Sequence, residues 1–435
     1  MQSMPSSTRR QFLRHAAATG TTLSLALPAT GGYHAAGSDA LKIGLIGCGG
    51  RGAGAVASAL RVDPTARLVA VADAFADRIE PRLRALERQF GERAAVARNR
   101  RFAGFDAYRG VLDSGVDLVI LAAPPHFRPA HVRAALEAGV HVFAEKPMAV
   151  DAPGYRSLLE SAELADRKGL CLVSGFELRF SPAAQEAFGM VREGAIGELL
   201  SAQGTYNIGY LWHRGRRPQW TEMEYQMRNW YYFTWLSGDH LVEQTVHLVD
   251  LLCWVAGDRP PRQAWGYGGR AQRTDPKWGD IFDHHAVVYD FDPPLRGYAF
   301  TRQQMNCYNE VSFRVSGSKG RLELVKWGGF RFSGAVTREL PVPREHPELR
   351  TFRQMFQAIR AGTVINDGRR FALSTMVAIM GRMATHSGQL VRWEDAVRSS
   401  LKLAPERYAW DAAPPVLPRP DGSYPHPVPG FTRAV

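Results

Sequence analysis

The sequence predicts an α/β domain built on a parallel sheet, followed by an α+β domain with an open, mostly antiparallel sheet. Three observations predict this fold class. Strand and helix patterns alternate from residue 41 to about residue 150, as a parallel sheet with crossover helices requires. Longer alternating segments rich in β-branched and aromatic residues fill the second half, as antiparallel strands do. The first strand also leads directly into a glycine-rich turn and a helix.

The glycine-rich turn comes after the apolar strand 42–46 and contains the pattern G-x-G-x-x-G. In Rossmann-type dinucleotide-binding domains, these glycines permit a tight turn, backbone approach to the pyrophosphate, and packing of the helix on the strand. The free N–H groups at the helix start then bind phosphate. A glycine triplet alone also fits a flexible turn, so the prediction depends on the residues beyond it. We expect cofactor contacts from the whole turn, which comprises Gly47, Cys48, Gly49, Gly50, Arg51 and Gly52.

Asp73 supports the dinucleotide prediction. It closes a second apolar strand, residues 68–72, about 20 residues beyond the last glycine, where an acidic side chain binds the ribose hydroxyls. A carboxylate there repels a 2′-phosphate, so the sequence favours NAD over NADP. Arg78 lies nearby and keeps NADP as the alternative.

The rest of the first domain continues the alternation to residue 150. We expect helical segments at 79–90 and 128–138, strands at 116–122 and 140–144, and a further segment of the alternation at 103–112. Because the carboxyl ends of parallel strands share one edge, Gly47, Asp73, Pro124 and Lys146 are expected along that edge.

The second domain is predicted over residues 151–404 and a proline-rich tail over 405–435, which we expect to wrap the surface without regular structure. Helical patterns cover 152–168, 182–193, 351–361 and 372–386. Strand patterns cover 171–176, 199–206, 263–268, 284–291, 298–304, 311–316 and 321–325. The exposed face of such an open sheet favours a homo-oligomer.

Residues 1–37 are predicted to be a twin-arginine signal peptide rather than part of the fold. Thr8-Arg9-Arg10-Gln11-Phe12-Leu13-Arg14 carries the arginine pair, and a modest apolar run covers 16–27. This route exports folded proteins, which suits a protein that loads a nucleotide before export to the periplasm. A disordered basic tail is the alternative. No segment reaches the roughly 18 uninterrupted apolar residues of a membrane span.

Composition and charge narrow the function classes. The formal net charge is +12, but the basic residues are scattered along the chain, which argues against nucleic-acid binding. The four cysteines have no paired spacing, so no disulfide is predicted, and Cys48 is expected to be a small buried residue of the turn. His284 and His285 lie near Asp280 and Asp283, but adjacent strand residues point to opposite faces, so no metal is predicted.

Lys146 is the first candidate catalytic residue. It comes directly after a buried strand whose end points toward the nicotinamide, and a desolvated lysine has a lowered pKa suited to proton exchange with an alcohol. The alternative is a surface lysine beside a turn proline.

A second candidate group lies on the predicted helix 241–256. Glu243, His247, Asp250 and Trp254 share one face of that helix, next to an apolar stripe. Ionisable groups beside a core-facing stripe are costly unless they line a pocket or pair with one another. An exposed helix face capped by Asp239 is the alternative.

Aromatic residues gather at 206–235 around two polar side chains. Flat aromatic faces beside such groups suit a sugar, although this density equally fits loop packing or a subunit contact. The predicted substrate-binding residues are Arg179, Arg228, Asn229, Trp230, Tyr232 and Asp250.

Five segments resemble the Gfo/Idh/MocA family of oxidoreductases. They are residues 43–52, AAPPHFRPAH at 122–131, AGVHVFAEKP at 138–147, REGAIGEL at 192–199, and residues 247–257. The resemblance implies a Rossmann domain with an open-sheet domain, and a proton-exchanging histidine at His247. It places Glu243 where the family usually has an aspartate that orients this histidine, and it supports Lys146 as a site residue. Further implied cofactor contacts are Ala123, Pro124, Pro125, His126, His131, Glu145 and Lys146.

Together these observations predict an exported NAD-dependent oxidoreductase that acts on a carbohydrate or glycoside. His247, supported by Glu243 and with Lys146 close by, would move the hydroxyl proton. We expect NAD to stay bound through many turnovers, because free NAD is scarce outside the cytoplasm. Two alternatives stay open: redox-neutral cleavage of a glycosidic bond through transient oxidation, and a non-catalytic binding protein on the same fold.

Overall fold

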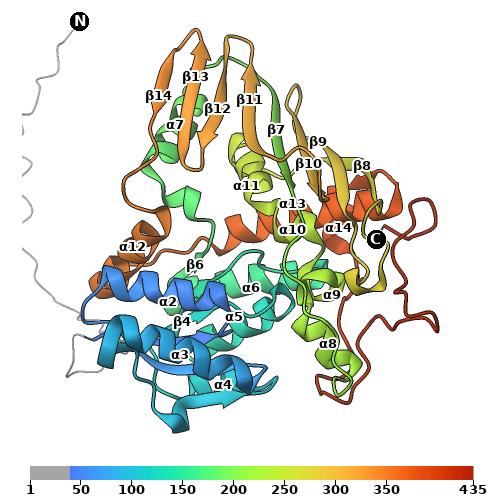
Figure 1. Cartoon of the computed structure of the whole chain (residues 1–435). Coiled ribbons are helices and arrows are strands. Elements are labelled where there is room, and N and C mark those ends of the chain that lie inside the picture. The colour runs from blue at the N-terminus through green and yellow to red at the C-terminus, as the bar shows by residue number, and fades with distance from the viewer. Residues whose placement is uncertain (1–39, 435) are drawn as a thin grey trace, which may run out of the picture. The chain divides into compact units, whose positions relative to one another are not determined.

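The computed structural model describes residues 40–434, which form a six-stranded and a nine-stranded sheet with helices packed around them (Figure 1). The predicted signal peptide, residues 1–37, lies outside the described residues. Within 40–434, no helix combines the length and the apolarity that crossing a bilayer requires.

The six-stranded sheet is entirely parallel and has the order β3-β2-β1-β4-β5-β6. Its strands are β1 (Lys42–Ile46), β2 (Arg67–Asp73), β3 (Arg101–Ala103), β4 (Leu118–Leu121), β5 (His141–Ala144) and β6 (Leu172–Ser174). The strand order reverses between β1 and β4, which is where doubly wound sheets bind their ligands. β1, β4 and β5 are almost wholly buried, so their near-continuous apolar sequences fit a sheet covered on both faces.

Helices α2 (Gly50–Val62), α3 (Ala76–Phe90), α4 (Ala107–Leu112), α5 (Arg128–Glu137) and α6 (Ala152–Lys168) connect these strands. Two details refine the expected elements. The segment at 103–112, for which no single element was assigned, contains the end of β3 and then the short α4. β6 pairs with β5 from beyond residue 150, so the parallel sheet continues past the expected domain boundary.

The nine-stranded sheet has the order β14-β13-β12-β11-β7-β10-β9-β8-β15. Its neighbours pair antiparallel except for β7 with β10, which confirms the mostly antiparallel prediction. The strands are β7 (Leu199–Ile208), β8 (Gln263–Gly269), β9 (His284–Asp290), β10 (Arg296–Gln303), β11 (Glu310–Gly317), β12 (Gly320–Lys326), β13 (Gly329–Gly334), β14 (Arg338–Leu340) and β15 (Val391–Arg392). The last three strands were not expected from the sequence.

The remaining helices are α7 (Pro182–Arg192), α8 (Glu222–Arg228), α9 (Thr234–Ser237), α10 (His240–Glu243), α11 (Val246–Val255), α12 (Pro347–Ala361), α13 (Gly368–Ser387) and α14 (Trp393–Arg398). α13 is buried almost all round and packs against α6, α11 and β8. It therefore joins the cores of the two domains, and α12 likewise packs on α2 of the first domain.

The single helix expected at 241–256 is interrupted. α10 ends at Glu243 and α11 begins at Val246, and between them the backbone N–H of Thr245 bonds to the carbonyl of His240 at 3.2 Å. This spacing of five residues widens one helical turn, a feature that often marks functional sites. The expected single face from Glu243 to Trp254 is therefore not formed.

Residues 405–434 contain no helix or strand. Tyr408, Trp410 and Tyr424 of this tail pack on aromatic residues from both domains. The four cysteines are all free.

Candidate active site

The glycine turn has the geometry that each glycine predicts. Gly47 adopts φ +103°, and an added Cβ would lie 2.4 Å from the backbone of Ala122 and Ala123 on the neighbouring strand. A Cβ on Gly52 would lie 2.1 Å from the carbonyl oxygen of Gly47, whereas one on Gly49 would meet no atom within 4 Å. The first and third glycines thus permit close packing, and the second leaves open space before the start of α2.

A pocket of about 720 Å³ lies over this turn. Its wall includes the predicted cofactor residues Gly47, Cys48, Gly49, Gly50, Arg51, Asp73, Ala123, Pro124 and His131. The size, the open backbone at Gly49 and the helix start at Gly50 fit a dinucleotide whose pyrophosphate lies on the turn.

Asp73 lies at the end of β2, where the ribose-binding acid is expected. Its carboxylate accepts hydrogen bonds from the backbone N–H groups of Cys48, at 2.8 Å, and Phe75, at 2.9 Å. Burial raises its pKa, and these bonds with the charge of Arg78 oppose that rise. Asp73 therefore holds the glycine turn in place as well as facing the pocket.

Arginines line the same pocket, and the sequence prediction missed two of them. Arg82 and Arg214 join Arg78 and Arg228 in its wall. Burial lowers the pKa of Arg214, and the like charges of Arg78 and Arg228 lower it further. The pocket thus offers more positive charge than its carboxylates balance, as a polyanionic ligand requires.

The structure corrects part of the predicted substrate-binding set. Arg228 and Trp230 belong to the nucleotide pocket wall. Asn229 is buried and bonds to the backbone of Arg214, and the hydroxyl of Tyr232 donates to the carbonyls of the 211–212 loop. These two side chains shape the loop, because their polar groups are already used within the protein.

Arg179 and Asp250, also predicted to bind substrate, instead bond to each other in the core. The Arg179 guanidinium donates to both carboxylate oxygens of Asp250, at 2.8 and 2.9 Å, and also to Asp258. It lies over the ring of Trp254, and Ser374 donates to Asp250 at 2.7 Å. Both ionic side chains are at most 2% exposed, so this pair stabilises packing between α11, α13 and the 177–180 turn.

Lys146 and Glu243 form a second ion pair, which joins the two domains. The Lys146 ammonium donates to Glu243 Oε1 at 2.9 Å and to the Glu243 carbonyl at 2.5 Å, and both side chains are 12% exposed. The predicted role of Glu243 as the orienter of His247 is therefore wrong in this structure, since its carboxylate binds Lys146. Because α10 ends at Glu243 and α11 begins at Val246, the side chain of Glu243 lies in a different environment from the side chains of α11.

His247 lies in the first turn of α11, with its ring edge-on to Phe176 and Trp327 at 5.9 and 5.5 Å. Burial holds its pKa well below the ordinary value, and the nearby charges of Lys146 and Arg51 lower it further. This direction of the pKa favours the neutral imidazole at neutral pH.

Arg51 links the glycine turn to both domains. Its guanidinium donates to Glu145 Oε1 at 2.8 Å and also bonds to Glu348 of α12. Glu145, a predicted cofactor residue, is 4% exposed and is used in this pair. Glu348 lies some 300 residues away in sequence, and no local motif marked it.

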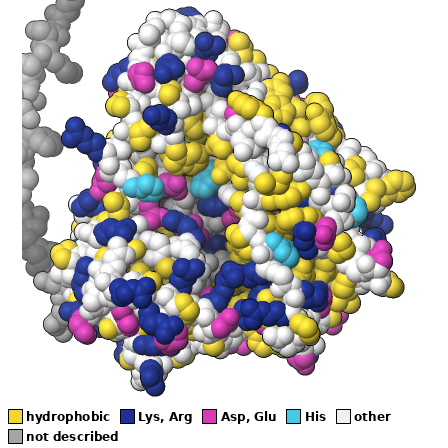
Figure 2. Space-filling view, in the orientation of Figure 1, with side chains coloured by type: hydrophobic (Ala, Val, Ile, Leu, Met, Phe, Trp, Pro, Cys, Tyr) yellow, Lys and Arg dark blue, Asp and Glu magenta, His cyan; other side chains and the backbone are white. Residues whose placement is uncertain are grey.

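His126 and His131 lie beyond the end of β4 and are both neutral. Burial lowers the pKa of His126 to about 4 and that of His131 to about 3. His131 stacks on Phe127 and faces the pocket, whereas His126 bonds through Nε2 to the hydroxyl of Tyr408 at 2.7 Å, and Pro125 is buried beside it. In the view of Figure 2, the surface is hollowed between the two domains, with charged and histidine side chains around the hollow.

The class of protein that the fold and the pocket fit best is a dinucleotide-dependent oxidoreductase. Comparison with known families agrees: residues 41–176 match the model described as "Oxidoreductase family, NAD-binding Rossmann fold", and residues 184–323 match the "GFO/IDH/MocA C-terminal domain". The chain belongs to the Gfo/Idh/MocA family, as its motifs predicted.

Two curated relatives indicate the range of chemistry in this family. A 2,7-anhydro-N-acetylneuraminate hydratase from Escherichia coli (strain K12) is 26% identical over 211 residues, 48% of this chain and 51% of that protein. Glycosyl hydrolase family 109 protein 2 from Shewanella sp. (strain ANA-3) is 30% identical over 196 residues, 45% of this chain and 41% of that protein. The chain thus spans about half the length of the relatives that it matches.

Solved structures share the fold at low identity. An aldose-aldose oxidoreductase from Caulobacter crescentus, complexed with glycerol, aligns with a TM-score of 0.63 and 20% identity over 81% of this chain and 99% of that one. A levoglucosan dehydrogenase in complex with NADH and levoglucosan aligns with a TM-score of 0.61 and 18% identity. The alignment covers 81% of this chain and 99% of that one. A 3-ketoreductase from Actinomadura kijaniata in complex with NADP and TDP-benzene aligns with a TM-score of 0.59 and 19% identity. The alignment covers 78% of this chain and 96% of that one. Neighbours of this fold therefore bind either dinucleotide.

Proposed function

We propose that this protein is an exported, NAD-dependent oxidoreductase that acts on a carbohydrate or glycoside hydroxyl. The observation that carries the proposal is the Lys146–Glu243 ion pair at the strand edge that carries the nucleotide pocket, with His247 close enough for the charge of Lys146 to lower its pKa. A general base must be unprotonated at working pH, and the lowered pKa of His247 supports that role.

Each of the three residues has a distinct part in the proposed chemistry. The nicotinamide ring, when bound, supplies the redox chemistry. His247 accepts the hydroxyl proton at a ring nitrogen. The Lys146 ammonium has three donors, of which two bond to Glu243, so one is free to hold the substrate oxygen. Glu243 fixes the position of that ammonium.

NAD is the proposed cofactor, with NADP as the alternative. Asp73 places a carboxylate at the ribose position, which disfavours a 2′-phosphate. The arginines in the pocket wall supply positive charge that would favour the 2′-phosphate of NADP. Competition of NAD and NADP for the purified protein, measured by calorimetry, tests this choice, and tighter binding of NADP would contradict it.

The C-terminal tail supports retention of the nucleotide. Trp410 packs on Phe105 and Phe75, with ring centroids 4.5 and 4.9 Å apart, and both phenylalanines line the pocket. Thr221 donates to the Trp410 carbonyl at 2.6 Å and so anchors the tail to the second domain. Such a clamp suits a protein exported with its cofactor, which the twin-arginine pattern at residues 8–14 favours.

The proposal is tested on purified protein. Mass spectrometry of the ligand released by denaturation is expected to find NAD, and a sugar and glycoside panel is expected to reveal turnover. Lys146→Gln and His247→Asn are expected to abolish turnover while nucleotide stays bound, and the exposed Lys326→Gln serves as the lysine control. Persisting turnover in both site variants would contradict the assigned roles.

A second candidate function is redox-neutral cleavage of a glycosidic bond, in which transient oxidation acidifies a neighbouring C–H. The hydratase and glycosyl hydrolase names of the two relatives favour it. Product analysis separates the two: a keto-sugar indicates a dehydrogenase, and a released aglycone without net NADH indicates cleavage. If the purified protein holds no nucleotide and NAD does not raise its melting temperature, the result would indicate a non-catalytic binding protein.

We also propose a homo-oligomer formed through the nine-stranded sheet. Trp265 and Tyr267 on β8 and Val311 on β11 are 42%, 67% and 44% exposed, which leaves apolar area on strands of that sheet. Light scattering after size exclusion tests this, and a strictly monomeric mass would contradict it.

A further inference from the structure

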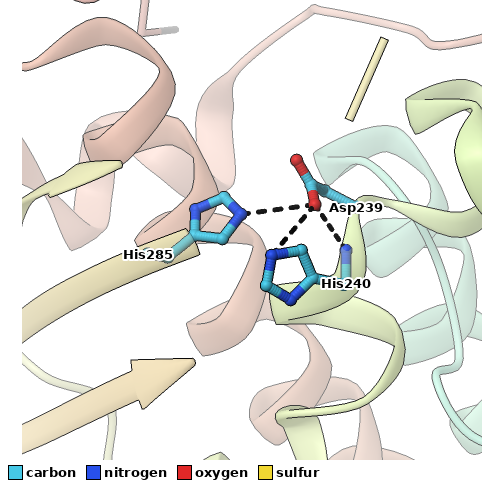
Figure 3. Close-up of side chains that lie close together, drawn as sticks. All are labelled: Asp239, His240 and His285. Carbon is cyan, nitrogen blue, oxygen red and sulfur yellow. Dashed lines mark hydrogen bonds and ion pairs between the residues drawn. The ribbon is translucent and has the colours of Figure 1, made fainter. Parts of the chain in front are cut away.

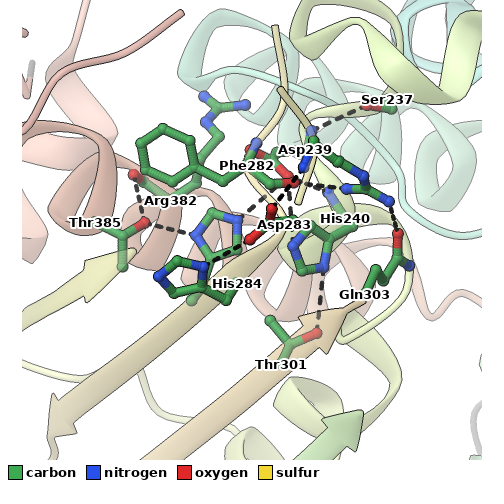
Figure 4. A network of polar contacts seen from close by, with 12 residues as sticks. Ser237, Asp239, His240, Phe282, Asp283, His284, Thr301, Gln303, Arg382 and Thr385 are labelled. Atoms are coloured by element: carbon green, nitrogen blue, oxygen red, sulfur yellow. Dashed lines mark hydrogen bonds and ion pairs between the residues drawn. The ribbon is translucent and has the colours of Figure 1, made fainter. Parts of the chain in front are cut away.

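Three histidines of the second domain, His240, His285 and His386, lie around the carboxylate of Asp239; Figure 3 shows the first two, and Figure 4 shows polar contacts near them. Asp239 and His240 stand at the start of α10, His285 lies on β9, and His386 lies in α13. All four are buried. Asp239 also adopts φ +74°, a backbone conformation that costs a non-glycine residue free energy and that clusters at functional sites.

Hydrogen bonds define which ring nitrogen of His240 and His285 carries the proton. His240 Nδ1 lies 3.3 Å from Thr301 Oγ1, whose own proton is donated to a backbone carbonyl at 3.0 Å. His285 Nδ1 lies 2.9 Å from Thr385 Oγ1, whose proton is likewise donated to a backbone carbonyl at 3.1 Å. Because each hydroxyl has given its proton away, each accepts one from Nδ1–H. With one proton per ring placed on Nδ1, each Nε2 carries a lone pair.

These two lone pairs converge on Asp239. His285 Nε2 lies 3.2 Å and His240 Nε2 4.0 Å from Asp239 Oδ1, and the three atoms lie within 4.8 Å of one another (Figure 3). Neither Nε2 atom makes a hydrogen bond of acceptable geometry to a residue in 40–434. Three buried acceptors facing one another are unfavourable unless a cation lies among them.

We propose that Asp239 Oδ1, His240 Nε2 and His285 Nε2 bind one divalent first-row transition-metal ion, with zinc as the best match. Tetrahedral ligands about 2.1 Å from zinc are roughly 3.4 Å apart, and the two Nε2 atoms lie 3.2 and 4.0 Å from Asp239 Oδ1. Imidazole and carboxylate ligands suit this class of metal. The proposed set differs from the sequence pairing of His284 with His285, because its ligands come from different elements.

The surroundings support the ligands as a second layer of contacts does in known metal sites. Thr301 and Thr385 hold the two rings through Nδ1. His386 donates from Nε2 to Asp239 Oδ2 at 2.9 Å, and the backbone N–H of Phe282 donates to the same oxygen at 3.0 Å. Oδ2 thereby accepts two hydrogen bonds, whereas Oδ1 accepts one, from the backbone N–H of His240 at 2.5 Å, and keeps a lone pair for the metal.

Other charges near the cluster are bonded elsewhere. The Arg273 guanidinium donates to a backbone carbonyl at 2.6 Å and bonds to Gln303, and Arg382 donates to backbone carbonyls at 2.7 and 3.3 Å. Asp283 accepts three backbone N–H groups and bonds to His284 (Figure 4). Asp280 accepts from Thr234 N–H, and burial raises its pKa to about 7. None of these groups hydrogen-bonds to either Nε2 atom.

The position of the site suggests a structural role. Its ligands tie the start of α10 to β9, and α10 ends at Glu243, which binds Lys146. The inference does not depend on the proposed oxidoreductase function, because metal content and folding are measured without substrate or nucleotide. Since the ligands are fully buried, the metal must enter during folding.

The test compares metal content in untagged protein expressed with added zinc. Plasma mass spectrometry is expected to find one metal ion per chain in the unchanged protein, and less than a tenth of that in His240→Gln and His285→Gln. His284→Gln is the matched control, because His284 neighbours His285 but points to the other face of β9 and is 38% exposed. It is expected to keep the metal. Cobalt incorporated in place of zinc is expected to give the visible absorption of a tetrahedral site in the unchanged protein and this control alone.

A refolding experiment covers the case in which the ligand variants do not fold. The unchanged protein, unfolded in guanidinium with a chelator, is refolded with and without zinc ions. Zinc is expected to raise the recovered folded fraction and the melting temperature. Less than a tenth of a metal ion per chain, both as purified and after refolding with zinc, would overturn the proposal and leave a proton shared by the two rings. Full metal content in both ligand variants would overturn it as well.

Discussion

Replacing Gly52 by alanine tests whether the third glycine of the turn is required by packing. The added Cβ would lie 2.1 Å from the carbonyl oxygen of Gly47 and 3.0 and 3.1 Å from side chains of Leu45 and Ala122. Non-bonded heavy atoms prefer about 3.5–4.0 Å, so the backbone of the turn must move. We expect this overpacking to cost about 1–3 kcal/mol of the free energy of unfolding.

Gly54→Ala provides the matched control. Gly54 lies two residues further along α2, is exposed, and an added Cβ would meet no atom within 4 Å. Alanine there is expected to raise the free energy of unfolding by about 0.5–1 kcal/mol, because glycine loses more backbone entropy in a helix. Both substitutions make the same chemical change in one helix, so the difference between them isolates the cost of the overlap.

Urea unfolding followed by circular dichroism, without added nucleotide, measures both free energies. NAD binding by calorimetry is expected to weaken in Gly52→Ala, because the moved carbonyl displaces the turn, and to stay unchanged in Gly54→Ala. Equal stability and equal NAD affinity of the two variants would refute the assigned role of the third glycine.

Three further predictions concern ionisation and the tail. Lys146→Met leaves the carboxylate of Glu243 without its partner and is expected to lower the free energy of unfolding by about 3–5 kcal/mol; adding Glu243→Leu should restore stability in urea unfolding but not turnover. The buried His131 is neutral, with a folded-state pKa of about 3, below its unfolded value, so its contribution to stability is present above pH 6.5 and is lost as pH falls toward 3. Between pH 6.5 and pH 3, the His131→Phe variant is therefore expected to lose about 1.4 kcal/mol less free energy of unfolding per pH unit than the unchanged protein, measured by urea unfolding at several pH values. If both proteins show the same dependence of this free energy on pH, His131 is protonated in the fold. Trp410→Ala is expected to speed nucleotide release in a stopped-flow chase, whereas Phe431→Ala, 88% exposed in the same tail, should leave the rate unchanged.

Local sequence was sufficient to predict the nucleotide half of the site. The strand, the glycine pattern, Asp73 and the run that ends at Lys146 lie on one sheet edge as expected, because parallel strands align their carboxyl ends. The expected domain boundary at residue 150 came too early, since nothing in the sequence shows that β6 joins the first sheet rather than the second.

The partners of the charged residues were much less predictable. The 3.6-residue period placed Glu243, His247 and Asp250 on one face, but the widened turn at Thr245 gives each a different environment. Periodicity assumes an unbroken helix, and the bond from Thr245 N–H to the His240 carbonyl breaks that assumption. Likewise, no pattern indicated that Arg179 would pair with Asp250 in the core.

The sequence by itself determined the fold class, the family and the glycine turn that lines the pocket, because these depend on strand periodicity and on backbone geometry that only glycine permits. The tertiary structure alone decided which ionisable groups pair, which are neutral, and where the tail lies. Those outcomes depend on burial and on distances between residues as far apart as Arg51 and Glu348, or Asp239 and His285. A side chain's charge and its partner are set by its surroundings, and folding brings those surroundings together.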